Sequence, residues 1–206
     1  MVDMIIEGIE SKNNSKKATV YTEVTPKRAT EILAGTLESR ELPRSSPNRW
    51  FAELALDRFE PQALKEKGIS RYQAVFASPV PYQGSKPIEG RVLLSLEIDT
   101  ERTYVAEGDS VTEIMMQGSI KRIRAFREVF GSSRVGVTRE EFEEKFNSMP
   151  EEEREALIRE VREGAERYWA SLVPYNVYVA QGQVYEEPEI LMIQGTVVTG
   201  IKESKL

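Results

Sequence analysis

The chain has 206 residues, of which 40% are hydrophobic and 30% are charged, and its formal net charge is −6 at pH 7. It contains no cysteine and no histidine, which excludes disulfides, thiol catalysis, histidine-ligated metal sites and Ser-His-Asp catalysis. Any chemistry therefore has to come from carboxylates, hydroxyls, amides, lysine, arginine or tyrosine, and the sequence predicts no metal. No apolar run approaches the roughly 20 residues that cross a bilayer, and the first residues lack a basic segment. We therefore expect no membrane association and a cytoplasmic location.

The first elements are predicted from local signals. Residues 1–17 are polar after a short apolar patch, so we expect a flexible lead-in. The alternation in "ATVYTEV" (18–24) predicts a strand. Thr25 is a suitable N-cap and Pro26 a suitable first helical residue, so a helix is predicted to follow at once and to end at Gly35.

The middle of the chain alternates loops with regular elements. "ESRELPRSSPNRW" (38–50) predicts an irregular cationic loop, and "YQAVFASPV" (72–80) and "RVLLSLEID" (91–99) predict strands. A helix over 119–130 places Ile120 and Ile123 on its apolar side and leaves Arg122 on a basic face.

An acidic segment over about 138–172 is predicted to be a helical hairpin. Thr138 with Glu141, and Ser148 with Glu151, match the spacing of a capping box, so two helices are expected. Tyr168 with Trp169 would anchor the hairpin to the core. Strands are then predicted over 175–180 and 189–198. The whole chain predicts the α+β class, with a mixed, mainly antiparallel sheet, in which 18–206 form one domain and the hairpin is an appended insertion.

"VYEEPEIL" (184–191) crowds three glutamates at the start of a strand. One interpretation is protective, because charge and proline at an exposed strand discourage edge-to-edge pairing. The other is catalytic: a carboxylate held at the lip of a cleft can stabilise a sugar cation while a glycosidic bond breaks. Glu187 and Glu189 are two residues apart and would share one face of the strand.

This Glu-x-Glu before a C-terminal apolar strand resembles the signature of mono-ADP-ribosyltransferases. "VYTEVTPKRATEILAGTL" and the strands at 72–80 and 91–99 are similar to other parts of that family. The resemblance implies a split sheet of ADP-ribosyltransferase type, NAD as substrate and no metal. Glu189 would engage the nicotinamide ribose, and Glu187 would prepare the acceptor. The NAD pocket would be lined by Tyr21, by Thr22 (where the family usually has Arg or His), and by Tyr72, Phe76 and Ser78.

Three further residues are candidates for holding NAD. Arg44 and Arg49 would hold the pyrophosphate and Trp50 would stack on a base, although a loop tryptophan is more often a packed cap. The sequence thus predicts transfer of ADP-ribose to a protein or nucleic-acid acceptor that it does not specify. The alternative is a non-enzymatic binding or assembly protein that uses the acidic hairpin as its docking surface.

Overall fold

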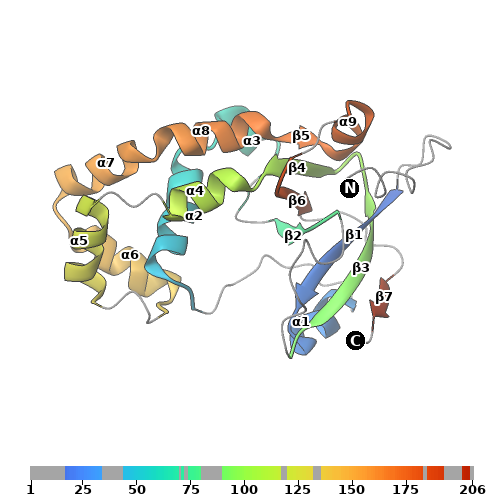
Figure 1. The fold of residues 1–206 in the computed structure, drawn as a ribbon, viewed down its shortest axis with the longest axis horizontal. Coiled ribbons are helices and arrows are strands. Elements are labelled where there is room, and N and C mark those ends of the chain that lie inside the picture. Colours follow the sequence, from blue (N-terminus) through green and yellow to red (C-terminus); the bar gives the residue numbers. More distant parts are fainter. Residues whose placement is uncertain are drawn as a thin grey trace, which may run out of the picture.

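The computed structural model describes residues 17–33, 44–69, 71, 74–79, 90–116, 120–131, 136–182, 185–192 and 201–204. Residues 1–16 of the predicted lead-in, Gly35 and Tyr72 lie outside these residues, whereas Lys17, also predicted as lead-in, begins the first strand. Strands gather at one end of the molecule and most helices at the other (Figure 1). None of the helices in the described ranges is long and apolar enough to cross a membrane.

One sheet has three strands in the order β1 (Lys17–Val24), β3 (Val92–Asp99) and β7 (Ile201–Ser204). β1 and β3 pair antiparallel along their whole length, from Lys17 opposite Asp99 to Val24 opposite Val92. Helix α1 (Pro26–Leu33) follows β1 directly, and the Thr25 carbonyl accepts its first bond from the Ala29 N–H at 2.9 Å. The predicted strand and the helix beginning at Pro26 are confirmed.

The second sheet has four strands in the order β2 (Val75–Ala77), β6 (Pro188–Met192), β4 (Thr103–Glu107) and β5 (Val173–Pro174). The two sheets meet where Tyr21 and Ser78 exchange backbone hydrogen bonds of 2.8 and 2.7 Å. Every strand pair in the described residues is antiparallel. The α+β class with antiparallel sheets is therefore confirmed.

β6 belongs to both hydrophobic cores of the molecule. Ile190 and Met192 are buried in the smaller core, with Val20 of β1 and Ile32 of α1, whereas Leu191 is buried in the larger, helical core. Alternate side chains of a strand point to opposite faces. Glu189 therefore faces the helical core, as Leu191 does.

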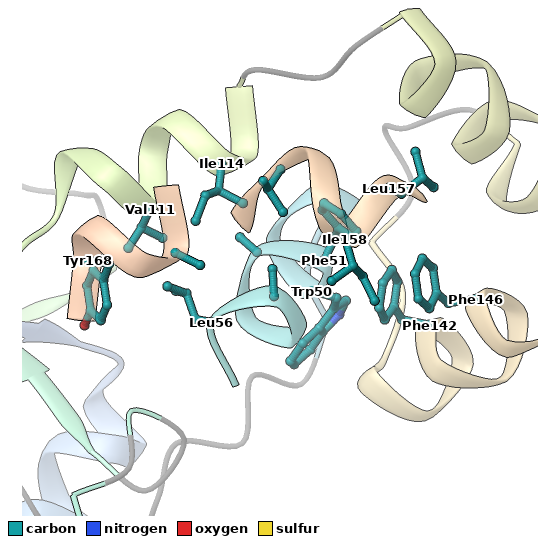
Figure 2. Close-up of a cluster of buried hydrophobic side chains, with 14 of the residues drawn as sticks. Trp50, Phe51, Leu56, Val111, Ile114, Phe142, Phe146, Leu157, Ile158 and Tyr168 are labelled. Carbon is teal, nitrogen blue, oxygen red and sulfur yellow. The ribbon is translucent and has the colours of Figure 1, made fainter. Parts of the chain in front are cut away.

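The helical core is built by helices that are far apart in sequence (Figure 2). Its helices are α2 (Pro47–Arg58), α4 (Asp109–Met116), α5 (Ile120–Phe130), α6 (Arg139–Ser148), α7 (Glu151–Glu160) and α8 (Arg162–Ser171), and α3 (Gln62–Glu66) lies beside α2 in the chain. Phe51 of α2 is fully buried and its ring lies edge-on to Phe126 at 5.5 Å and tilted against Phe146 at 6.0 Å. The segment predicted as an appended hairpin thus shares one core with α2 and α5.

Four predictions about elements are corrected by the structure. The segment at 138–171 forms three helices rather than two, and Ser148 ends α6 while Pro150 occupies the N-cap of α7. Residues 175–180 form helix α9 (Tyr175–Ala180) instead of a strand. The predicted loop at 38–50 contains the start of α2, whose N-cap is Ser46.

The fourth correction concerns the orientation of α5. Ile120 and Ile123 are 79% and 53% exposed, whereas Arg122 is only 1% exposed and its guanidinium lies 5.0 Å from the centre of the Phe51 ring. Arg122 also donates to the Met115 carbonyl at 3.2 Å. The contact with an aromatic face compensates part of the cost of burying the cation, so the helix is rotated relative to its hydrophobic pattern.

Candidate functional site

A cleft of about 330 Å³ opens where the two sheets meet the helical core. Its walls come from the end of β1, from β2 and the residue after it, from the start of β6, from α2 and from the turn between β4 and α4. The lining residues are Tyr21, Thr22, Glu23, Arg49, Phe76, Ala77, Ser78, Gly108, Val111, Thr112, Glu187, Pro188 and Glu189. The cleft therefore joins segments from most of the length of the chain.

Backbone contacts hold the segments that line the cleft together. The bridge between Tyr21 and Ser78 holds β1 against β2, and the Gly108 N–H donates to the Glu187 carbonyl at 2.7 Å. A Cβ at position 108 would lie 2.7 Å from that same carbonyl oxygen, a distance that only a glycine avoids. Gly108 thus lets β4 approach the Glu-x-Glu segment closely.

Glu189 is held by two partners inside the wall of the cleft. Its Oε2 accepts the Arg71 Nη1–H in a short contact and the Tyr168 hydroxyl at 2.7 Å, and its Oε1 accepts Arg71 Nη2–H at 3.1 Å. The Glu189 side chain is 18% exposed. A carboxylate oxygen has two lone pairs, so, counting donors among the described residues, Oε2 is saturated and Oε1 keeps one acceptor position for a ligand.

Arg71 is the buried centre of this network. Its side chain is 3% exposed, it donates from Nε to Glu53 Oε2 at 2.8 Å, and its guanidinium lies between the rings of Phe76 at 4.5 Å and Tyr168 at 5.0 Å. Burial alone lowers the pKa of Arg71, but the carboxylates of Glu189 and Glu53 raise it well above its usual value. Arg71 therefore remains a cation bound to the lining residue Glu189, although it does not itself line the cleft.

Glu53 and Tyr168 complete the network from two helices of the helical core. Burial raises the pKa of Glu53, but the charges of Arg71 and Arg49 outweigh it, so the pKa lies below its usual range. Arg49 binds Glu53 Oε1 at 2.7 Å from one helical turn away. Burial raises the pKa of Tyr168 well above its usual value. The hydroxyl therefore keeps its proton and donates a hydrogen bond to Glu189.

The structure brings most of the predicted site residues together. Seven of them line the one cleft: Tyr21, Thr22, Arg49, Phe76, Ser78, Glu187 and Glu189. Trp50 is different, because it is 5% exposed within the helical core and donates its indole N–H to the Val137 carbonyl at 2.8 Å. It is a packed residue of α2 and, unlike the other seven, does not line the cleft.

Three important residues were not predicted as part of the site: Arg71, Glu53 and Tyr168. Arg71 comes just before the apolar strand β2, where a charge has to find a partner, and Glu53 follows Arg49 at i+4 on α2. The i+4 spacing of Arg49 and Glu53 is a local signal of an ion pair on a helix, but it does not point to Arg71. Tyr168 was expected to anchor the hairpin, and its ring is fully buried as expected. Its hydroxyl contact with Glu189 depends on the tertiary fold.

A ligand in the cleft would meet carboxylates, one arginine, a serine hydroxyl and two aromatic side chains among the lining residues. No group of three or more acidic residues in the described ranges is arranged to hold a metal ion. Comparisons with protein families, with curated proteins and with solved structures find no match. The chemistry of the site therefore has to be argued from its geometry.

Proposed function

We propose that the cleft binds NAD and that the protein transfers ADP-ribose to a macromolecular acceptor, in an ADP-ribosyltransferase-type split-sheet fold. The observation that carries the proposal is the position of Glu189, a carboxylate in the cleft wall whose orientation is set by Arg71 and Tyr168. A rigid carboxylate at this place suits a reaction that develops positive charge on a ribose. The lining of the cleft by Tyr21, Phe76 and Ser78 also supports the proposal.

The proposed reaction exchanges one bond at the ribose for another. The bond between ribose C1′ and the nicotinamide nitrogen breaks, the bonding electrons leave with nicotinamide, and positive charge develops on C1′ and the ring oxygen. Glu189 stabilises that charge, and its Oε1 accepts a ribose hydroxyl. An acceptor nucleophile then forms the new bond to C1′, and Glu187 takes the proton that the nucleophile loses.

Two aromatic residues and one arginine would orient the substrate. The Tyr21 and Phe76 side chains come from the two adjacent strands β1 and β2, so a nicotinamide ring can lie between apolar surfaces with Ser78 beside it. Arg49 lines the same cleft with its side chain 25% exposed, and its guanidinium suits a phosphate oxygen. The acceptor would approach on the side of Glu187, which is exposed.

The test is nicotinamide release from NAD by the wild-type protein and by three matched variants. Glu189→Gln keeps the shape of the side chain and removes its charge, so it should lower the rate at least about a hundredfold. Glu187→Gln should lower transfer to an acceptor more than hydrolysis by water. Glu186→Gln makes the same change at an exposed position that does not line the cleft, and it should leave both rates unchanged.

The alternative of a non-enzymatic docking protein makes the opposite prediction. If wild-type protein neither binds nor cleaves NAD, and a calorimetric titration shows no heat of binding, the enzymatic proposal is contradicted. The edge-protection interpretation of the cluster is wrong, because β6 lies between β2 and β4 in the four-stranded sheet and is not an edge strand.

A further inference from the structure

The most unusual feature outside the predicted site is a buried arginine that two carboxylates share. Arg71 contacts Glu53 through Nε and Nη2 at 2.8 and 3.3 Å, and contacts Glu189 through Nη1 and Nη2. All three side chains are largely buried, at 3%, 13% and 18% exposure. The planar guanidinium can hold both carboxylates in fixed directions at the same time.

We propose that Arg71 and Glu53 are positioning residues for Glu189, an inference that rests on the proposed function. Arg71 fixes the direction of the Glu189 carboxylate, so that Oε1 keeps its open acceptor position toward the ligand. Among the described residues, Glu53 makes no hydrogen bond or ion pair with Glu189 and does not itself line the cleft, although it binds the lining residue Arg49. It acts through Arg71.

Charge gives Glu53 a second role. Arg71 alone beside Glu189 would make a neutral pair, which stabilises a ribose cation poorly. With Glu53 added, the three groups carry one net negative charge, because two carboxylates face one guanidinium. Arg49 also binds Glu53, at the Oε1 atom that accepts from Arg71 Nη2, so the full set of two guanidiniums and two carboxylates is neutral. Glu53 thus offsets the positive charge of Arg71 beside Glu189.

Tyr168 locks the same arrangement from the helical core. Its hydroxyl accepts from Arg71 Nη1 at 2.6 Å and donates to Glu189 Oε2 at 2.7 Å. α8 therefore completes the support of Glu189, and the acidic helical segment contributes directly to the site. Figure 2 shows Tyr168 at the end of the helical core that is nearest the strands.

The first experiment measures whether Glu53 and Glu189 are energetically coupled through Arg71, and it does not depend on enzymatic activity. Urea unfolding would be followed for Glu53→Gln, Glu189→Gln and the double variant. Either single change leaves Arg71 one carboxylate, whereas the double change leaves a buried cation with none, which is strongly destabilising. Each variant's effect is the ratio of its unfolding constant to that of the wild type. We expect the ratio for the double variant to be at least ten times larger than the product of the two ratios for the single variants. A double variant that cannot fold gives the same answer where the two single effects added together would leave it folded.

The matched control is Glu60→Gln. Glu60 is also a buried glutamate, 8% exposed just after α2, and its ionic neighbours are Lys65 and Asp57 instead of Arg71. Combining it with Glu189→Gln should give a simple product of the two single effects. If the Glu53 and Glu189 changes also combine as a simple product, the shared-arginine proposal is refuted.

The second experiment separates positioning from folding by kinetics. In NAD cleavage, Glu53→Gln should lower kcat at least tenfold, because the Glu189 carboxylate loses its fixed direction, whereas any change in KM reports on Arg49, which Glu53 also binds. Glu60→Gln should change neither constant. A raised KM with unchanged kcat for Glu53→Gln would overturn the positioning role. Failure of the wild type to cleave NAD would refute the proposed function, while the unfolding cycle would still decide whether Arg71 couples Glu53 to Glu189.

Discussion

At the scale of single residues, two largely buried glutamates show how neighbouring charges decide whether an ionised carboxylate stabilises or destabilises the folded state. Glu53 faces Arg71 and Arg49, and its pKa lies below the ordinary value because these charges outweigh burial. Glu60 has a carboxylate oxygen that is buried and finds no hydrogen-bond partner among the described residues. Burial therefore raises its pKa. The ionised form of Glu53 favours the folded state, and that of Glu60 disfavours it.

These directions predict opposite effects of pH on two variants. Relative to the wild type at pH 7, Glu53→Gln should lower the free energy of unfolding by about 1–3 kcal/mol, and Glu60→Gln should raise it. The stabilising effect of Glu53 is present above its unfolded pKa, near 4.5, and is lost as the pH falls through the lower folded pKa. The penalty of Glu60 is present above its raised folded pKa and disappears as the pH falls to about 4.5.

Urea unfolding of the wild type and both variants at pH 7, 5.5 and 4 checks this prediction. The difference between wild type and Glu60→Gln should shrink first as the pH is lowered, and the difference for Glu53→Gln should persist to lower pH. A Glu60→Gln variant that is less stable than the wild type at pH 7 would show that Glu60 has a favourable partner.

The same residues show how much of the site can be predicted from the sequence. Glu187 and Glu189 could be paired because a strand has a period of two, and Tyr21 lies in a strand with clear alternation. Arg71 gave no such signal, because its partners Glu53 and Glu189 are 18 and 118 residues away. A buried ion-pair network is a property of the tertiary fold, so local patterns leave it out.

At the scale of elements, the predictions succeed where a local signal and the tertiary packing agree. β3 and α1 were predicted because their patterns match the faces that they bury. The segment Tyr175–Ala180 has strand propensity but forms α9, in which Tyr175 and Tyr178 both pack on the smaller core. Residues three apart lie on one face of a helix, so burying both tyrosines together favours the helix over the strand.

Two serines test whether a predicted N-cap contributes to stability: Ser46 caps a helix in the structure, and Ser148 was predicted to cap one but does not. The Ser46 hydroxyl accepts from the Arg49 N–H at 3.2 Å and caps α2, the helix that carries Arg49 and Glu53. Ser46→Ala should therefore cost about 1 kcal/mol in the free energy of unfolding. Ser148 matched a capping box in the sequence but is an exposed residue at the end of α6, where its hydroxyl donates to the Lys145 carbonyl.

Ser148→Ala should accordingly change the free energy of unfolding by less than about 0.5 kcal/mol. Thr138→Ala is the positive control, because Thr138 and Glu141 form a complete capping box at the start of α6. Thermal or urea unfolding of the three variants checks the order. A Ser148→Ala variant as destabilised as Thr138→Ala would mean that the sequence-based capping box is formed after all.

At the scale of the whole molecule, the strands of the four-stranded sheet connect two cores. Leu191 and Ala106 are buried with the helices, and Ile190 and Val105 are buried with the three-stranded sheet. The cleft lies at this junction, so both cores position its walls. The tight contact between Tyr168 and Glu189 links the helical core to the strand that carries the Glu-x-Glu segment.

This shared core determines what happens when the acidic helical segment is removed. The sequence suggested that residues 138–172 are an appended module and that the sheets would fold without them. Replacing 139–171 by a Gly-Ser linker would expose Phe51 and Phe126, which pack against Phe142 and Phe146, and would leave Arg71 without Tyr168. Full exposure of each buried aromatic costs about 1.5–3 kcal/mol, and the total is comparable to the whole stability of a domain.

We therefore expect the shortened chain to lose cooperative unfolding, as followed by circular dichroism and by the fluorescence of Trp50, which is buried in the same core. A milder pair of variants tests the same packing in the full chain. Phe146→Ala should cost about 3–5 kcal/mol because it opens a cavity against Phe51, whereas Glu144→Ala, at an exposed position of the same helix, should change stability by less than about 0.5 kcal/mol. If the shortened chain unfolds cooperatively and Phe146→Ala is as stable as Glu144→Ala, the helical segment is a separable module and the two cores are independent.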